Sequence, residues 1–319
     1  MSSSITRLAA AAAVVASASA AALLNAVPAE AFSPPLTSAG IRVHFDLAGG
    51  QMPENVVTDR NGSVAVTLAG ARQVARVSSR GEVRVLATLP APKDPRATTP
   101  LLGFPLTSGL VRDGRTFYVA YATGSRAETG IWTFEEGRRP RKIADLPASG
   151  LPNGMVMDHA TKTLYVTDSV RGVVYSVGTR GTVTTFSTDP ALTSTGFFGV
   201  NGAKIRAGRL YVSNLDRGTV LSSPLRGRGA GTFTTEARDL QGIDDFAFTG
   251  KGEQLIASLV TENKVVLVDG PATTTILTGD DGLSNPSAVA VRGDTVYVTN
   301  AAYTTQKDPN LLVAHLGRP

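Results

Sequence analysis

Apolar and polar residues alternate along most of this chain in short runs that end at turn-forming dipeptides. The clearest runs follow the first fifty residues, and Asn61-Gly62, Ala69-Gly70 and Arg80-Gly81 lie between them. Alternation with a period of two, interrupted by such pairs, predicts antiparallel strands joined by hairpins. The four runs occupy residues 54–59, 63–68, 72–79 and 82–89.

Six such units follow one another along the chain. The first strand of each unit opens on a polar residue, and the second often ends in Tyr-Val. Successive openings lie 43 to 54 residues apart, a period typical of β-propeller blades. We therefore predict an all-β, six-bladed β-propeller. The openings are Glu54, Ser108, Asn153, Asn201, Asp244 and Ser287, and tyrosines expected to pack between blades recur at 118, 165, 211 and 297.

The last unit is one strand short, because only three strands fit between Ser287 and Pro319. Residues 41–48 read as a strand that belongs to no other unit. We expect this N-terminal strand to close the last blade, which leaves no exposed edge where the two ends of the chain meet. The predicted propeller domain spans residues 41–319, and residues 32–40, rich in Pro and Ser, are expected to form a leader outside the ring.

The first 31 residues resemble a secretory signal peptide. A short start containing Arg7 precedes a stretch of Ala, Val and Leu, and Ala29 and Ala31 form a small-residue cleavage site. An uncleaved membrane anchor is the alternative, but the stretch is rich in Ala and interrupted by Ser. We expect a secreted protein, cleaved after Ala31, that does not associate with membranes.

The amino-acid composition excludes some classes of site and argues against others. Cysteine is absent, which excludes disulfides, thiolate catalysis and Cys-ligated zinc. The 31 Lys and Arg exceed the 26 Asp and Glu, but the densest basic runs, 137–142 and 226–228, fall in turn-like segments expected to be solvated loops. Without interleaved aromatic residues they do not favour nucleic-acid binding. We expect a monomer whose partner is a small-molecule substrate.

The polar openings point to a metal site. In a propeller the first strand of each blade lines the central channel, so the openings form a ring at one mouth. Two carboxylates and two carboxamides in that ring, without His or Cys, suit a hard cation such as Ca²⁺. The alternative is that these are turn residues, as Asn-Gly pairs often are. Four acidic or amide residues at six equivalent places favour the metal.

Five short motifs recur in order along the chain: Pro53-Glu54, 152–155, 164–169, 200–202 and 244–248. Together they resemble the senescence-marker protein/gluconolactonase family of six-bladed propellers, and more loosely the paraoxonases and strictosidine synthases. The resemblance covers the whole chain after the signal segment. It implies a divalent metal, Ca²⁺ or another such as Mg²⁺, Mn²⁺ or Zn²⁺, held by Glu54, Asn153, Asn201 and Asp244.

Asp245 is a further candidate. Strand alternation turns it away from the direction of Asp244, but paraoxonase-like relatives use two adjacent residues at this place. We expect it to be a supporting ligand or a proton acceptor.

The chain also departs from the gluconolactonase pattern. Those enzymes carry Arg and Asn around the second blade, whereas residues 102–109 and 196–199 here are mainly apolar. The mouth is therefore expected to be less polar than a sugar site. The irregular stretch 90–107 reads either as a lid or rim loop or as a surface excursion. The three histidines, 44, 159 and 315, are expected to have structural or surface roles.

The leading hypothesis is a secreted metal-dependent hydrolase, a lactonase or similar esterase. The ion would polarise the ester carbonyl, and Asp244 or Asp245 would accept a proton from the attacking water. The alternative is a non-enzymatic propeller that binds a ligand or protein partner and has a structural metal in its channel. A condensing enzyme of the strictosidine-synthase type is weaker, because no suitably placed Glu is evident.

Overall fold

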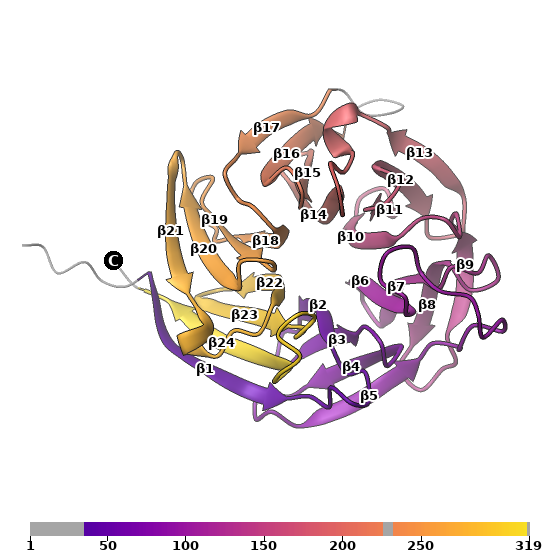
Figure 1. Ribbon diagram of the computed structural model, residues 1–319, viewed down its shortest axis with the longest axis horizontal. Coiled ribbons are helices and arrows are strands. Elements are labelled where there is room, and N and C mark those ends of the chain that lie inside the picture. The colour runs from indigo at the N-terminus through magenta and orange to yellow at the C-terminus, as the bar shows by residue number, and fades with distance from the viewer. Residues whose placement is uncertain (1–34, 226–231, 318–319) are drawn as a thin grey trace, which may run out of the picture. The chain divides into compact units, whose positions relative to one another are not determined.

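The computed structural model describes residues 35–225 and 232–317. Their strands form six four-stranded antiparallel sheets, arranged as blades around a central axis (Figure 1). The predicted six-bladed β-propeller is therefore confirmed. The predicted signal peptide, residues 1–31, and the basic run 226–228 lie outside the described residues. No helix within the described ranges is long and apolar enough to cross a membrane.

Four consecutive strands make each of the first five blades, and the blades are numbered here in chain order. Blade 1 holds β2 (Pro53–Thr58), β3 (Val64–Leu68), β4 (Gln73–Val77) and β5 (Val83–Thr88). Blade 2 holds β6 (Leu106–Asp113), β7 (Thr116–Ala122), β8 (Gly130–Glu135) and β9 (Arg141–Asp145). Blade 3 holds β10 (Pro152–Asp158), β11 (Thr163–Asp168), β12 (Val173–Gly178) and β13 (Val183–Ser187).

The second half of the ring follows the same plan and adds two short 3₁₀ helices, η1 (Pro190–Leu192) and η2 (Gly279–Asp281). Blade 4 holds β14 (Val200–Arg206), β15 (Arg209–Asn214), β16 (Thr219–Pro224) and β17 (Thr234–Ala237). Blade 5 holds β18 (Ile243–Phe248), β19 (Leu255–Leu259), β20 (Lys264–Asp269) and β21 (Ala272–Leu277). Blade 6 holds β22 (Pro286–Arg292), β23 (Thr295–Asn300), β24 (Asn310–Leu316) and β1 (Leu36–His44).

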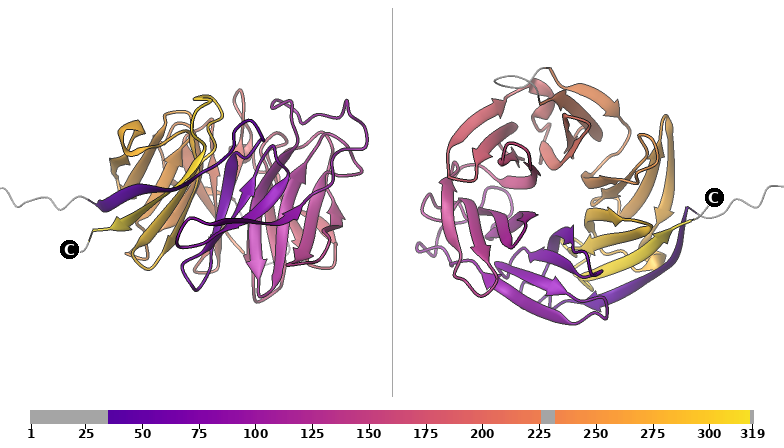
Figure 2. Two further views of the ribbon diagram at one scale, coloured as in Figure 1. Left: turned by 90° about the horizontal axis from the view of Figure 1, so that it is seen from below. Right: turned by 180° about the vertical axis from the view of Figure 1, so that it is seen from behind.

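The N-terminal strand closes the last blade, as predicted. β1 pairs antiparallel with β24, from Leu36 opposite Leu316 to His44 opposite Asn310, and both views show it along the outer side of blade 6 (Figures 1 and 2). The predicted bounds were wrong, however. Leu36 to Gly40, assigned to a leader, belong to the strand, which ends before a turn that contains Gly50 (φ 73°). Most β1 side chains are exposed, so backbone pairing rather than an apolar pattern defines this strand.

Apolar side chains pack between neighbouring blades. Six clusters in the described part of the chain each join residues of two adjacent blades, including blades 6 and 1. The predicted packing of the repeated tyrosines is confirmed: each is buried in a cluster with the blade that follows. These are Tyr118, Tyr165, Tyr211 and Tyr297.

The first strand of every blade carries an irregularity near its opening. In β10, β14 and β18, for example, the register with the second strand shifts between Pro152 and Met155, Val200 and Ala203, and Ile243 and Phe246. A bulge bends the strand and re-aims its side chains. The polar openings therefore sit where the regular alternation of the sheet is broken.

Glycine follows three of the openings because the next blade leaves no room for a side chain. A Cβ on Gly109 would lie 2.3 Å from the carbonyl oxygen of Asn153, and one on Gly154 would lie 2.2 Å from that of Asn201. Both glycines lie within strands, so Asn153-Gly154 is not a turn. Close approach of blades around the channel explains the Asn-Gly pairs.

We expect Gly154→Ala to destabilise the fold by about 1–3 kcal/mol, because the added methyl overlaps the backbone of blade 4. Thermal unfolding monitored by circular dichroism measures the effect. Gly196→Ala is the matched control, since nothing lies within 4 Å of a Cβ at that position. Equal melting temperatures for the two variants would show that the blades are not packed this closely.

Candidate functional site

A cavity of about 280 Å³ lies at the end of the channel where the first strands begin, and we call it the mouth cavity. Four of the six openings line it: Glu54 of β2, Asn153 of β10, Asn201 of β14 and Asp244 of β18. All four are at least 93% buried. The residues predicted as metal ligands are thus brought together from four blades.

The serines at the other two openings, Ser108 and Ser287, do not line the mouth cavity but form hydrogen bonds between blades. The hydroxyl of Ser108 donates to the carbonyl of Pro152 (2.8 Å), and that of Ser287 donates to the carbonyl of Pro53 (2.7 Å). Each bond joins one blade to the next, and its acceptor belongs to the residue that immediately precedes Asn153 or Glu54. Serine in blades 2 and 6 therefore fixes the backbone that presents the neighbouring polar residue.

Glu54 is an acid in an apolar setting. Burial, the largest influence, raises its pKa to about 8, the nearby Asp245 carboxylate adds to the rise, and a hydrogen bond from Tyr303 opposes it. The hydroxyl of Tyr303 donates to Glu54 Oε2 at 2.5 Å. An ionised Glu54 at this place needs compensating positive charge.

Asp244 is likewise a buried acid whose pKa is raised. Burial, and then repulsion from Glu54 and Asp245, raise its pKa well above the ordinary value, while a side-chain hydrogen bond from Asn201 opposes the rise. Asn153 donates from Nδ2 to Ser169 Oγ (3.1 Å), which leaves its Oδ1 as the atom for a ligand. The mouth cavity therefore combines two destabilised carboxylates with two oriented amides.

Asp245 points elsewhere. It is 4% exposed, it does not line the mouth cavity, and its Oδ1 pairs with Lys204 Nζ at 2.5 Å. Asp245 therefore lies apart from the cavity that Asp244 lines, although the register of β18 shifts between Ile243 and Phe246 and its strand alternation is interrupted there. Any role it has at the mouth must act through space or through Lys204.

The donor set of the mouth cavity suits a hard divalent cation. Carboxylate and amide oxygens are the ligands that Ca²⁺ takes, and a cation would offset the burial of two acids. In the described part of the chain, no group of three or more His, Cys, Asp or Glu side chains is arranged to hold a metal. A metal here would therefore depend on the two amides as well as Glu54 and Asp244.

The walls above the polar residues are apolar. Two loops supply much of this surface: the irregular stretch after β5, which contributes Leu101, Leu102 and Phe104, and the segment before β14, which contributes Phe197 and Phe198. Leu101 is 58% exposed and Phe197 is 44% exposed, so both reach the rim. The expectation of a mouth less polar than a sugar site agrees with this lining.

Asp216 holds the second of these loops. Its Oδ2 accepts backbone N–H groups of Thr195, Gly196 and Phe197 at 2.8 Å each, and its Oδ1 accepts that of Phe198 at 3.2 Å. Four bonds to one carboxylate fix the loop firmly. The paired aromatic rings are therefore held at the rim rather than left to move freely.

Tyr303 is the main site residue that sequence reasoning missed. It lies between β23 and β24, outside the repeated Tyr-Val position. Asn285 orients its loop by accepting the N–H groups of Thr304 and Thr305 at 2.9 Å and donating to the carbonyl of Val260 at 3.0 Å. An aromatic residue out of register with the repeat was the available signal.

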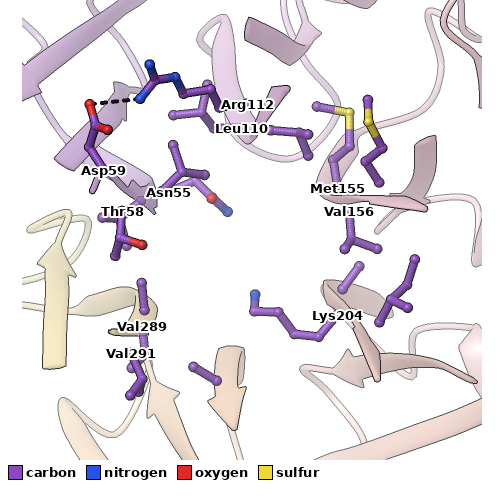
Figure 3. Close-up of a pocket in the computed structure, with 18 of the residues that line it drawn as sticks. Asn55, Thr58, Asp59, Leu110, Arg112, Met155, Val156, Lys204, Val289 and Val291 are labelled. Atoms are coloured by element: carbon purple, nitrogen blue, oxygen red, sulfur yellow. Dashed lines mark ion pairs between the residues drawn. The ribbon is translucent and has the colours of Figure 1, made fainter. Parts of the chain in front are cut away.

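A second and larger cavity, of about 740 Å³, lies at the other end of the channel (Figure 3). We call it the distal cavity. It is lined further along the same first strands, by residues such as Asn55, Met155, Lys204 and Val289. In the close-up, the side chain of Lys204 extends into the open centre of this cavity.

No protein-family model matches the sequence, and no curated protein matches it. Solved structures do match. A calcium-binding protein, regucalcin, from Agrobacterium tumefaciens is 16% identical with a TM-score of 0.60, over 84% of this chain and 92% of that one. A luciferin-regenerating enzyme is 12% identical with a TM-score of 0.61, over 87% and 95%.

The aldose sugar dehydrogenase of Streptomyces coelicolor, in its PQQ-bound form, is 14% identical with a TM-score of 0.63, over 89% of this chain and 100% of that one. At these identities the likeness shows the fold alone. The resemblance to regucalcin-type, senescence-marker propellers is confirmed at that level. Chemistry must be argued from the residues of this chain.

Proposed function

We propose that the protein is a metal-dependent hydrolase, a lactonase or esterase that acts at the mouth cavity with Ca²⁺ as its metal. The observation that carries the proposal is the convergence of Glu54, Asn153, Asn201 and Asp244 beneath apolar walls. A small cavity with mainly apolar walls and a few convergent polar groups is the usual form of a small-molecule site. The calcium-binding regucalcin of similar fold is consistent with this choice of ion.

In this proposal the divalent ion, when bound, polarises the ester carbonyl and stabilises the negative charge that develops on its oxygen. Asp244 is the proton acceptor for the attacking water, because it lines the mouth cavity and Asp245 does not. Tyr303 keeps the Glu54 carboxylate in place. Leu102, Phe104 and Phe198 exclude bulk water and pack against the apolar part of the substrate.

A panel of aliphatic and aryl lactones and esters, with gluconolactone for comparison, tests the proposal. We expect hydrolysis of the less polar compounds that stops on chelation and returns with Ca²⁺. Hydrolysis that is insensitive to chelators contradicts the metal-dependent mechanism. Calcium-dependent thermal stability without hydrolysis of any compound favours the alternative, a propeller that binds a ligand around a structural metal.

A further inference from the structure

An ion pair lies next to the mouth cavity, because Asp245 directly follows Asp244, which lines that cavity. Lys204 of β14 reaches across to Asp245 of β18, and the Nζ to Oδ1 distance is 2.5 Å. The carboxylate is almost fully buried, whereas the lysine side chain is 28% exposed on the side of the distal cavity. The same ammonium lies 5.6 Å from the centre of the Phe246 ring, so two neighbouring side chains of β18 hold it.

The backbone is shaped around this pair. A Cβ on Gly202 would lie 2.4 Å from Asp245 Oδ1. Glycine after Asn201 therefore makes room for the carboxylate, in contrast to Gly154, which makes room for a backbone carbonyl. The pair is a built part of the channel and not an incidental surface contact.

Charge connects the pair to the candidate metal site. Burial is the largest influence and raises the pKa values of all three acids. Asp245 also raises the pKa values of Glu54 and Asp244, Glu54 raises that of Asp244, and Lys204 lowers those of Asp244 and Asp245. When all three acids are ionised, three negative charges and one positive charge leave the buried group at −2. A divalent cation would bring the whole group to neutrality, which the low-polarity interior favours.

We propose that Asp245 and Lys204 act as a counter-charge pair that sets the net charge of the mouth site at −2 and thereby matches it to a divalent cation. Asp245 in this arrangement is a positioning residue and not a metal ligand. Its carboxylate neutralises the Lys204 ammonium, which would otherwise repel the cation. The inference rests on the metal site of the proposed function and identifies what determines its charge.

Removing Asp245 alone should weaken metal binding. In Asp245→Asn the ammonium of Lys204 is uncompensated and the site carries only −1, so we expect the Kd for Ca²⁺ to rise on the order of tenfold. Removing the charges of both Asp245 and Lys204 leaves the Glu54 and Asp244 carboxylates and restores a net charge of −2 at the site. We therefore expect the double variant Asp245→Asn with Lys204→Met to bind Ca²⁺ within about threefold of the parent protein.

Isothermal titration of the chelator-treated protein with CaCl₂ alone measures these constants, and circular dichroism checks folding. If Asp245 is itself a ligand, the double variant stays as weak as the single variant, which overturns the inference. Parent-like affinity in Asp245→Asn also overturns it. If the single variant does not fold, comparison of the double variant with the parent decides the question alone.

The same titration separates this inference from the proposed function. Ca²⁺ binding by the parent, with weak binding by the double variant, contradicts only the counter-charge role. Absence of Ca²⁺ binding by the parent contradicts both. Binding behaviour as expected, without turnover of any lactone or ester, contradicts the hydrolase and leaves the counter-charge pair supported.

Discussion

Replacing Glu54 with Gln and Asn201 with Ala in one variant should reduce metal-dependent hydrolysis by a hundredfold or more. Both residues line the mouth cavity, and loss of a carboxylate and an amide removes half of the proposed ligand set. Changes that merely orient a metal ligand typically lower activity or affinity by about 10–100-fold, so loss of two ligands should exceed that. Initial rates on the most active lactone, at saturating Ca²⁺, measure the effect.

The control for this variant is Asn55→Ala. Asn55 follows Glu54 on β2 but lines the distal cavity, so its loss should leave the rate nearly unchanged. Full activity in the Glu54→Gln and Asn201→Ala protein would show that the mouth cavity is not a metal-dependent active site. Equal losses in the control and the double variant would point to general damage to the channel.

Chelation should lower the melting temperature of the protein by about 5–10 °C. At a Ca²⁺ concentration of a hundred times the Kd, binding to the folded state adds about 2.7 kcal/mol of stability. For a domain of this size, each kcal/mol shifts the melting temperature by roughly 2–4 °C. The large effect is expected because Glu54 and Asp244 are both buried and their mutual repulsion is relieved by a cation.

Scanning calorimetry with and without added CaCl₂ measures this shift, and Glu54→Gln should remove most of it. Asp59→Asn serves as the matched carboxylate control. Asp59 lies at the distal cavity, where it pairs with Arg112 at 2.8 Å, so its loss should lower the melting temperature without changing the response to Ca²⁺. A calcium response that survives in Glu54→Gln would place the stabilising ion elsewhere in the protein.

The repeat in the sequence was sufficient to predict the blades. Alternating strands with hairpin signals are local features, and tyrosines at equivalent places mark packing that every blade repeats. The residues at the blade openings were also predictable, because a first strand of a propeller must face the channel. The bounds of β1 were not, since its side chains are mostly exposed and its place is defined by pairing with β24.

Residues outside the repeat were harder to find. Tyr303 reaches Glu54 across 249 residues of sequence, and only ring closure brings their segments together. The pairing of Lys204 with Asp245 has the same origin, because it joins the first strands of two blades. Neither contact leaves a spacing pattern that a reader of the sequence could recognise.

The sequence by itself determined the number of blades, the strand that closes the ring and the four oxygen-bearing residues at its mouth. Only the tertiary structure decided that Asp244 lines the mouth cavity whereas Asp245 pairs with Lys204, that Tyr303 bonds to Glu54, and that apolar loops enclose the site. The physical reason is that strand periodicity is encoded locally along the chain. The burial and mutual repulsion of charges depend on which blades meet around the channel.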